Sequence, residues 1–540
     1  MPASRRRSYL AVPVLIALCS LAAGVFMGGG ASAASPPTDP ADQSLRTFSQ
    51  LYDVVEKNFA DPVKAETAIY KGAIPGMLRT LDPHSSFHDP KDFAAMRDDQ
   101  RGAYYGVGMT VATRNNQTIV IAPFPGSPAA KAGIRPGDVI QQVNDTKTDG
   151  LSTTEVADLL RGQRGTKVQV QVNREGAEKP LLFAITRDEI PRFSVTGGFF
   201  LKPGVAYIHI ASFNENTSQE MEDKLKKLNE KSIQGLILDL RENPGGLLNE
   251  GVDVAGHFLK KGDLIVFHHG RNSPTKNYTA KYDGSGKDYP IVVLVSKYTA
   301  SAAEIVSGAL QDHDRAWILG ETTFGKGLVQ TVYPMGDNTG LALTTAHYYT
   351  PSGRLIQRDY SNISFLDYYT QSGAESKNLN DVKMTDSGRT VYGGGGITPD
   401  EKYEKPMANP FQISVARKDS FFEFSRKYFG THDTKLAQGW EPDEAIVTAF
   451  RKHLTDNGVT VSDADFAANH DWMRRELKRE MYITAFSTDD SERVQIQQDP
   501  MVIRGIESLP KAKALLDTAK NMRVQRMNRQ DSATTPIAHR

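Results

Sequence analysis

Cysteine is almost absent from this sequence, which has one cysteine, Cys19, in 540 residues. Because Cys19 lies in an apolar run near the N-terminus, the rest of the chain has no disulfide, no thiol nucleophile and no thiolate metal ligand. An excess of charge is also absent, since 64 Lys and Arg residues balance 64 Asp and Glu residues. That balance gives no indication of a nucleic-acid partner. Walker and dinucleotide-binding patterns are missing too, and we expect no cofactor and no metal.

Long hydrophobic runs are confined to the N-terminus. Three arginines, Arg5 to Arg7, precede a nearly uncharged run from Tyr9 to about Gly30, and Ala31-Ser-Ala33 follows. A basic flank, an apolar core and an A-x-A sequence predict a secretory signal peptide over residues 1–35. The run of roughly 20 residues is also long enough to remain as a membrane anchor.

A lipoprotein signal at Cys19 is a third alternative, although the preceding Leu18 is not the small residue that such processing prefers. All three alternatives place the remaining chain outside the cytoplasm. We therefore expect an exported protein, periplasmic or otherwise extracytoplasmic, that is either free or anchored to the inner membrane by its N-terminal segment.

The remaining chain divides by periodicity into five segments. After a Pro-rich linker at 36–42, apolar residues recur at helical spacing over 45–60, and a second helix is predicted over 65–81. Alternating apolar residues then indicate short strands. The predicted segments are a helical region (36–93), a β-rich unit (94–188), an α/β unit (189–401), a mostly helical region (402–526) and a disordered tail (527–540).

The α/β unit alternates buried strands with helices. Apolar strand patterns occur at 205–210, 235–240, 291–295 and 317–320, and helical patterns occur between them. This alternation predicts a parallel or mixed sheet covered by helices.

Ser301 follows one of these strands in the stretch T299-A-S-A-A-E304. Ser301 and Glu304 match a capping box at the start of a helix. The same position suits a nucleophile, because amides at a helix N-terminus favour negative charge, although by only about 0.3–1 kcal/mol. A serine nucleophile therefore needs a base as well, and the local sequence leaves the two interpretations open.

Histidines are poor candidates for this base. His313 is 12 residues beyond Ser301, about 18 Å along a continuous helix. His257 lies in a predicted helix and His347 in a predicted strand, and neither has an acidic partner in its local sequence. His313 therefore cannot reach Ser301, and we expect His257 and His347 to be structural.

Lys326 is the other candidate base, flanked by glycines in T322-T-F-G-K-G-L-V-Q330. A lysine acts as a base only when it is neutral, and burial favours that state. Gln330 can orient the amine without adding charge, but an extended chain would separate the two Cα atoms by about 13 Å, so a helical turn or a bend is required. The alternative is an exposed turn between strands.

A third fragment, D239-L-R-E-N-P-G-G246, joins a buried strand to a helix. Its glycines leave backbone amides free to face an oxyanion, or they simply form a tight connection.

Together these fragments resemble the carboxyl-terminal processing, or tail-specific, proteases of peptidase family S41. The ordered motifs are L-D-P-H-S (81–85), R-x-N-P-G-G (241–246), A-S-A-x-E (300–304), T-F-G-K-G-x-V-Q (323–330) and Y-Y-T-P-S-G-R (348–354). The resemblance covers roughly residues 40 to 400. It implies a multidomain α/β protein with an N-terminal helical segment, a β-barrel-like PDZ domain, a crotonase-like β-α-β spiral core and a helical C-terminal extension.

The resemblance also implies the site. Ser301 would be the nucleophile, Lys326 the base and Gln330 its orienter. The amide of Gly246, or of its neighbour Gly245, would form the oxyanion hole with the amide of Ala302.

In the PDZ domain, Tyr105, Gly106, Val107 and Gly108 resemble the loop that binds a peptide carboxylate, and A129-A-K-A-G-I-R-P-G-D-V-I140 supports this assignment. The implied activity is that of a serine endopeptidase that cleaves the C-terminal tails of exported proteins through an acyl-enzyme. Protein or peptide substrates with free C-termini are the expected partners, with a homodimer or an adaptor protein as further possibilities.

Two rivals remain: an inactive PDZ-containing peptide-binding adaptor and an acyl-CoA enzyme. The sequence also departs from the family pattern in two places. Residues 356–392 look like an insertion before G396-I-T-P-D400, and the helical region after 402 lies outside the family core.

Overall fold

The computed structural model describes residues 39–114, 116–361, 364–370, 378–404, 406–432 and 435–534. The chain separates into two compact units, Met1–Gly76 and Met77–Arg540. The described part of the first unit is helical, with α2 (Pro40–Asn58), α3 (Ala65–Ala68), the π-helical turn η1 (Ile69–Ala73) and the start of α4 (Ile74–Arg79). The two N-terminal helices predicted from periodicity are present, and the second contains the π turn.

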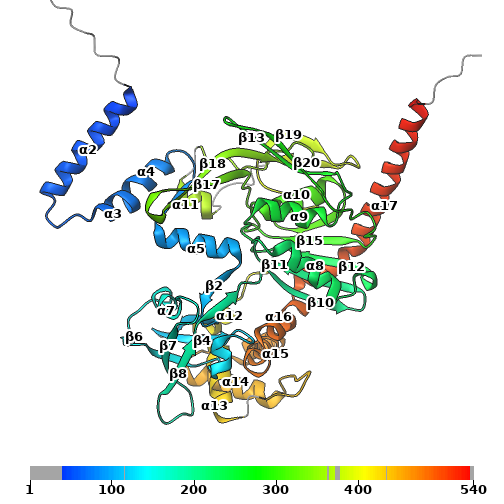
Figure 1. Ribbon diagram of the computed structural model, residues 1–540. Helices are drawn as coiled ribbons and strands as arrows, with labels where there is room; N and C mark the ends of the chain where they lie inside the picture. Colours follow the sequence, from blue (N-terminus) through cyan, green and yellow to red (C-terminus); the bar gives the residue numbers. More distant parts are fainter. Residues whose placement is uncertain are drawn as a thin grey trace, which may run out of the picture. The chain divides into compact units, whose positions relative to one another are not determined.

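The α/β unit is built on a six-stranded sheet (Figure 1). All neighbouring strands are parallel except β10 and β11. Every residue of β12 and β15 is buried, which explains the apolar runs at 236–238 and 291–295. The prediction of a parallel or mixed sheet is confirmed. The strand order is β10 (Val195–Lys202), β11 (Val205–Ile210), β12 (Gly235–Asp239), β15 (Ile291–Val295), β16 (Ala316–Gly320) and β21 (Glu401–Lys402).

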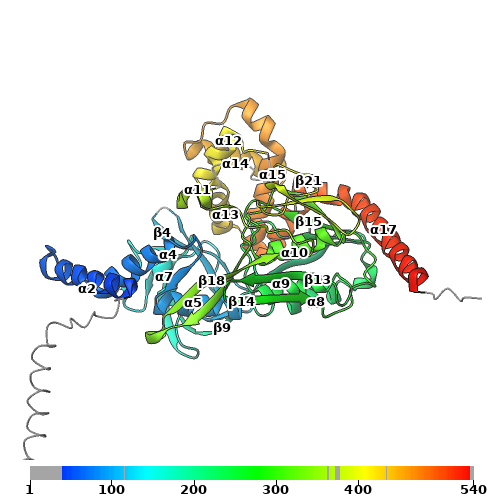
Figure 2. The same ribbon diagram turned by 90° about the horizontal axis from the view of Figure 1, so that it is seen from above.

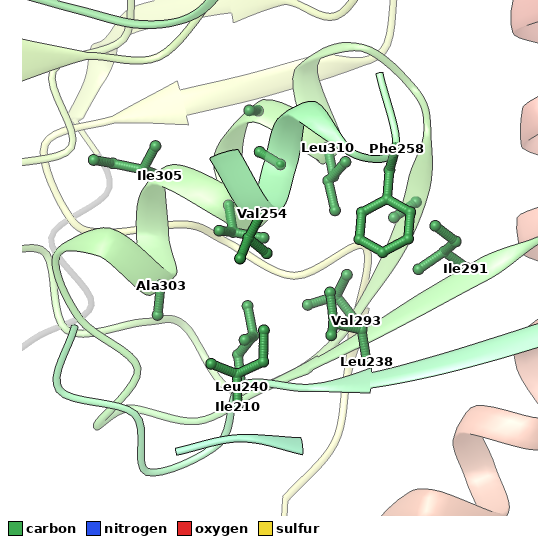
Figure 3. Packing of buried hydrophobic residues seen from close by; sticks show 14 of the residues in the cluster. Ile210, Leu238, Leu240, Val254, Phe258, Ile291, Val293, Ala303, Ile305 and Leu310 are labelled. Carbon is green, nitrogen blue, oxygen red and sulfur yellow. The ribbon is translucent and has the colours of Figure 1, made fainter. Parts of the chain in front are cut away.

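Helices cover both faces of this sheet. On one face, α8 (Thr217–Lys227), α9 (Leu248–Gly256) and α10 (Ala302–Asp312) share a core with Leu238 and Val293. Figure 3 shows the part of this core that α9 and α10 form with the strands. On the other face, the neighbouring residues Ile237 and Val292 pack with α17 (Pro500–Thr534). The period-two alternation of strand side chains thus assigns each residue to one of two cores.

A second, antiparallel sheet carries the segments that approach α10. Its order is β1 (Ser86–His88), β18 (Gly340–Tyr349), β13 (Leu264–Gly270) and β14 (Ser273–Thr279), and β17 (Leu328–Pro334) also pairs with β18. The predicted insertion after Arg354 contains α11 (Phe365–Thr370) and the hairpin of β19 (Asn378–Met384) and β20 (Thr390–Gly393).

The β-rich unit begins later than the sequence predicts. The predicted boundary at residue 94 falls inside α5 (Pro90–Arg101). Asp89 accepts the amides of Lys91 and Asp92 and so caps this helix, a pattern that a search for strands overlooks. The first strand of the unit is β2 (Ala103–Gly106), which pairs with β9 (Asp188–Pro191).

The remaining strands of the β-rich unit enclose their own core. They follow the order β3 (Met109–Arg114), β4 (Gln117–Pro123), β5 (Val139–Val143), β7 (Lys167–Asn173) and β8 (Leu181–Thr186), with β6 (Thr146–Lys147) beside β5. Two helices, α6 (Pro128–Ala132) and α7 (Thr153–Leu160), complete the unit, and Val156 and Leu160 of α7 face the core.

The C-terminal region contacts both of these units. Helices α12 (Pro410–Arg417), α13 (Ser420–Thr431), α14 (Glu444–Asp456) and α15 (Asp463–Ala485) form a separate apolar cluster (Figure 2). From α13, Arg426 pairs with Glu175 of the β-rich unit. After α16 (Thr488–Gln497), α17 covers the sheet of the α/β unit.

The predicted disordered tail from Met527 overlaps α17, which continues to Thr534. Residues 511–534 contain no glycine or proline, so nothing in the local sequence interrupts the helix. Residues 535–540 lie outside the described residues.

No helix among the described residues is both long enough and apolar enough to cross a membrane. The Tyr9–Gly30 run, to which the signal and anchor predictions apply, lies outside those residues.

The packing of α17 generates a stability prediction. Leu509 is 9% exposed and lies against Gly235 of the central sheet, whereas Ile503 on the same helix is 43% exposed. Leu509→Ala should cost about 2–5 kcal/mol through the cavity that it leaves, and should lower the midpoint of thermal unfolding measured by calorimetry. Ile503→Ala is the matched control and should change stability by no more than about 0.5 kcal/mol. Equal effects of the two substitutions would contradict this packing.

Candidate active site

Ser301 stands at the N-terminus of α10, a helix in which every residue is buried. Its backbone has φ +54° and ψ −117°, a combination that costs a non-glycine residue free energy and that clusters at functional sites. Gly245 lies directly against Ser301, and only glycine leaves enough room there. A Cβ on Gly245 would lie 2.6 Å from the Ser301 Cβ. The turn at Pro244-Gly245-Gly246 is thus packed directly against the serine.

Glu304, three residues later, ties the serine to the lysine segment. Its buried carboxylate accepts the Ser301 amide at 2.9 Å, the Gly325 amide at 2.7 Å and the Lys326 amide at 2.8 Å. The Thr323 hydroxyl donates to the same carboxylate at 2.5 Å. Burial raises the pKa of Glu304, and these hydrogen bonds oppose the rise.

The capping-box motif predicted for Ser301 and Glu304 is present at the start of α10. Glu304 reaches back to the Ser301 amide as the motif predicts. The Ser301 side chain, however, makes no capping hydrogen bond to the described residues. The hydroxyl is left available for chemistry, while the carboxylate holds the helix start in place.

Lys326 lies in the loop between β16 and β17, and its amine donates to Gln330 Oε1 at 2.9 Å. The predicted bend is present as a break in the pairing of β17 with β18 between Val329 and Gln330. Burial lowers the pKa of the Lys326 amine, against the opposing influence of Glu304 and Asp82. The Lys326 amine therefore loses its proton more readily than an ordinary lysine.

Tyr348 of β18 joins the two segments a second time. Its buried hydroxyl lies 3.0 Å from the Ser301 carbonyl oxygen and also within hydrogen-bond reach of the Lys326 carbonyl oxygen. The backbone on both sides of the site is therefore fixed to one side chain.

Gln330 is held by the Leu81–Ser85 turn. Its Nε2 donates to the His84 carbonyl oxygen at 2.6 Å, which leaves Oε1 facing the lysine. Asp82 stabilises the turn by accepting the amides of His84 and Ser85, each at 2.7 Å. An amide with both ends occupied in this way has one orientation.

The two glycines of the turn beside Ser301 differ in their hydrogen bonding. The Gly245 amide donates to Asn243 Oδ1 at 2.7 Å, and the Asn243 side chain in turn donates to the Ile210 carbonyl oxygen at 2.7 Å. The amides of Gly246 and Ala302 have no acceptor among the described residues. Gly245 is therefore engaged, and the other two amides are the free donors near the serine.

The four residues predicted to bind a peptide carboxylate lie at the start of the β-rich unit. Tyr105 and Gly106 end β2, while Val107 is buried in the core of the unit. Ser127 donates to the Gly108 carbonyl oxygen at 2.7 Å and fixes the loop. The adjacent β3 ends the strand order of this sheet, and α7 lies beside it.

A cavity of about 1370 Å³ runs from this loop to the turn beside Ser301. On the side of the β-rich unit it is lined by Val107, Gly108 and Leu160. On the side of the α/β unit Gly245 and Gly246 line it. The predicted carboxylate loop and the predicted oxyanion turn thus open into the same space.

Comparison with known proteins identifies the family. A model of peptidase family S41 matches residues 204–362, and a PDZ domain model matches residues 119–174. A carboxy-terminal-processing protease of Bartonella bacilliformis is 37% identical over 343 residues, which are 62% of this chain and 79% of that protein. The carboxy-terminal processing protease CtpB of Bacillus subtilis is 30% identical, over 75% of this chain and 87% of its own. The chain belongs to the carboxy-terminal processing proteases of family S41.

A solved photosystem II D1 C-terminal processing protease is 31% identical, covering 66% of this chain and 87% of its own, with a TM-score of 0.35. Family membership confirms the prediction of a serine peptidase with a PDZ domain, an α/β protease core and a helical C-terminal region. It favours the peptidase over the adaptor and the acyl-CoA enzyme.

Two of the histidines considered as bases, His257 and His313, have partners away from Ser301. His313 lies between Asp386 and the Leu264 carbonyl oxygen, and His257 contacts the Ser218 hydroxyl. His84 and His88 are four residues apart, a spacing that occurs in metal sites, yet the His84 ring contacts Tyr368 and the His88 ring contacts Ser86. The described residues contain no group of three or more side chains placed to hold a metal ion.

Sequence reasoning assigned no role to Asn243, Tyr348 or His84, although each lies within a quoted family motif. Their contacts are made through a buried amide, a tyrosine hydroxyl and a backbone carbonyl group. Residue type alone gives no signal for such roles. Position within the motifs was the only available clue.

The contact between Gly245 and Ser301 generates a prediction for activity. Gly245→Ala adds a Cβ that must displace Ser301, so peptidase activity should fall by at least about tenfold while the fold is retained. Gly262→Ala is the matched control, since Gly262 has a similar φ of +90° against +95° for Gly245 but open space around its Cβ. Both substitutions carry the backbone cost of positive φ, and only the first should reduce kcat. Comparable losses of kcat in both variants would argue against the contact.

Proposed function

We propose that Ser301 is the nucleophile of this protease, Lys326 its general base and Gln330 the residue that orients the base. The observation that carries the proposal is the environment of the Lys326 amine. Burial lowers its pKa, and its hydrogen-bond partner among the described residues is a neutral amide. A carboxylate in that place would hold the amine protonated.

In the proposed reaction, the neutral Lys326 amine accepts the Ser301 proton while Oγ attacks the carbonyl carbon of the scissile peptide bond. The amides of Gly246 and Ala302 bind the oxyanion, and Gly245 supports the serine. Lys326 then donates its proton to the leaving amine. A water molecule, deprotonated by Lys326, finally hydrolyses the acyl-enzyme and returns the serine.

We propose that proton transfer from Ser301 to Lys326 requires bound substrate. The described residues contain no hydrogen bond between the Ser301 hydroxyl and another side chain, including Lys326. Catalytic hydrogen bonds commonly tighten only when substrate binds. We propose that the peptide brings the hydroxyl and the amine together at the closed end of the cavity.

We further propose that the substrates are the C-terminal tails of exported proteins. A tail adds as a strand along β3 beside α7, and its carboxylate binds the amides of Val107 and Gly108. The shared cavity supports this proposal because it continues to Gly246. The signal-like residues 1–35 support an extracytoplasmic location.

Substitution of the two principal residues tests the mechanism. Ser301→Ala and Lys326→Ala should each reduce cleavage of a denatured test protein by at least about 10²-fold, the typical contribution of general acid–base catalysis. Binding of a fluorescent tail peptide should persist in both variants. His257→Gln, which changes a polar group outside the proposed site, should retain activity. Full turnover by either site variant would refute the assigned roles.

The pH dependence provides a separate test. Because the base must be neutral, kcat/KM should rise with pH as Lys326 loses its proton. The midpoint should lie below 10.5, the ordinary lysine value, because burial lowers this pKa. Lys326→Arg should be inactive throughout, since a guanidinium stays protonated. A profile that falls or stays flat where Lys326 titrates would be inconsistent with a lysine base.

The carboxylate loop can be tested with synthetic substrates. Amidation of a peptide's C-terminus should raise KM by about 10- to 100-fold, which corresponds to the loss of hydrogen bonds to a charged group. Acetylation of the N-terminus of the same peptide is the control and should have little effect. If the amidated and free peptides are cleaved equally well, the loop does not recognise the carboxylate.

A further inference from the structure

We propose that residues 356–361 and 364–370, here called the tyrosine strap, position the Lys326–Gln330 pair, and that Tyr368 and Tyr369 are its positioning residues. The strap includes α11 and belongs to the segment that departs from the family's motif pattern. This inference rests on the proposed roles of Lys326 and Gln330. It adds to them a pair of residues that touch neither substrate nor the reacting atoms.

The strap is joined to the backbone on both sides of Lys326. The Arg358 amide donates to the Gly325 carbonyl oxygen at 2.9 Å, and the Gly327 amide donates to Gln357 Oε1 at 2.8 Å. A Cβ on Gly325 would lie 3.0 Å from the Arg358 Cβ, and one on Gly327 would lie 2.8 Å from the Gln357 backbone nitrogen. The two glycines around the lysine therefore leave the space that the strap occupies.

The strap is also joined to the turn that holds Gln330. The Tyr368 hydroxyl lies 2.8 Å from His84 Nε2, and the Tyr369 hydroxyl donates to the Pro83 carbonyl oxygen at 2.7 Å. The next link is the His84 carbonyl oxygen, which accepts Gln330 Nε2 at 2.6 Å. Two tyrosines thus hold consecutive residues of the turn that fixes the orienting amide.

Interactions within the strap fix Tyr368 itself, which is 1% exposed. The Arg358 guanidinium donates to the Tyr368 carbonyl oxygen at 2.6 Å, and Gln357 Nε2 donates to the Tyr368 hydroxyl at 3.2 Å. The Arg358 guanidinium also lies 4.5 Å from the Tyr368 ring centroid and 4.6 Å from that of Phe324. The strap is a packed layer over the lysine loop.

This layer contributes to the burial of Lys326, whose side chain remains partly exposed. The titratable and charged groups around Lys326 are Glu304 on α10, Asp82 and His84 on the turn, Tyr348 on β18 and Arg358 and Tyr368 on the strap. Burial, together with the positive charges of Lys326 and Arg358, lowers the pKa of His84 to about 4, so its ring is neutral at neutral pH. Loosening the strap admits water to the amine without changing the nearest charges.

The test compares three tyrosine-to-phenylalanine substitutions in the full-length protease. Tyr368→Phe and Tyr369→Phe each remove one hydroxyl contact with the turn. Tyr360→Phe is the matched control, because its ring lies 6.3 Å from the Tyr368 ring while its hydroxyl makes no hydrogen bond to a described residue. Tyr369 is 39% exposed, so its substitution keeps the test informative if Tyr368→Phe fails to fold.

We expect Tyr368→Phe and Tyr369→Phe each to lower kcat by about 3- to 10-fold, in line with the loss of one hydrogen bond, with KM for a tail peptide unchanged. The midpoint of the pH–rate profile should also move to higher pH, because a hydrated lysine regains its ordinary pKa. Tyr360→Phe should match the wild type in both measurements. A purely structural role for the tyrosines would lower the unfolding temperature and leave the midpoint in place.

The inference is overturned if Tyr369→Phe and folded Tyr368→Phe keep the wild-type kcat and midpoint, or if Tyr360→Phe changes them equally. Lys326→Ala, measured alongside, separates this failure from failure of the proposed function. If Lys326→Ala is inactive and the tyrosine variants are unaffected, only the proposed role of the strap is refuted. If Lys326→Ala is active, the proposed role of Lys326 as the base is refuted.

Discussion

One buried carboxylate, that of Glu304, determines where the serine and the lysine lie. The two residues come from different elements, the start of α10 and the loop before β17, and no shared strand pairing fixes their separation. Glu304 accepts backbone amides from both segments. An unpartnered buried carboxylate would cost several kcal/mol, and its four hydrogen-bond donors offset that cost. The hydrogen bonds that stabilise the buried Glu304 carboxylate are therefore the same ones that fix the positions of the serine and lysine segments.

The segments around Glu304 are also joined to one another by buried hydrogen bonds. Tyr348 ties the carbonyl groups of the two segments, and the Leu81–Ser85 turn ties Gln330. The tyrosine strap holds the turn and the lysine loop together. In each case one segment supplies the hydrogen-bond partner that holds the next segment in place. The result is that the Lys326 amine is buried beside the neutral amide of Gln330 instead of a carboxylate.

The sequence predicted the parts of this structure that local patterns determine. Apolar runs such as 291–295 became strands buried on both faces. The family motifs singled out Ser301 and Lys326, although chemistry alone left a capping role for the serine open. The two interpretations are compatible, since the capping box of Ser301 and Glu304 leaves the Ser301 hydroxyl without a hydrogen bond to another side chain among the described residues.

What the sequence did not predict depends on distant contacts. His84 and Gln330 are 246 residues apart, and His84 and Tyr368 are 284 apart. The bend that brings Lys326 to Gln330 arises from the pairing of β17 with β18, which neither strand specifies alone. The predicted boundary at residue 94 falls inside α5, a capped helix that precedes the first strand. Local periodicity contains no information on these long-range arrangements.

The position of α17 has a consequence for how the protein is made. One apolar face of the central sheet, with Tyr207 and Ile237, is covered by a helix that begins only at Pro500. Synthesis runs from the N-terminus, so a ribosome must translate nearly the whole message before this face can be buried. Until then one apolar face of the sheet stays uncovered, although the last of its six strands ends at Lys402.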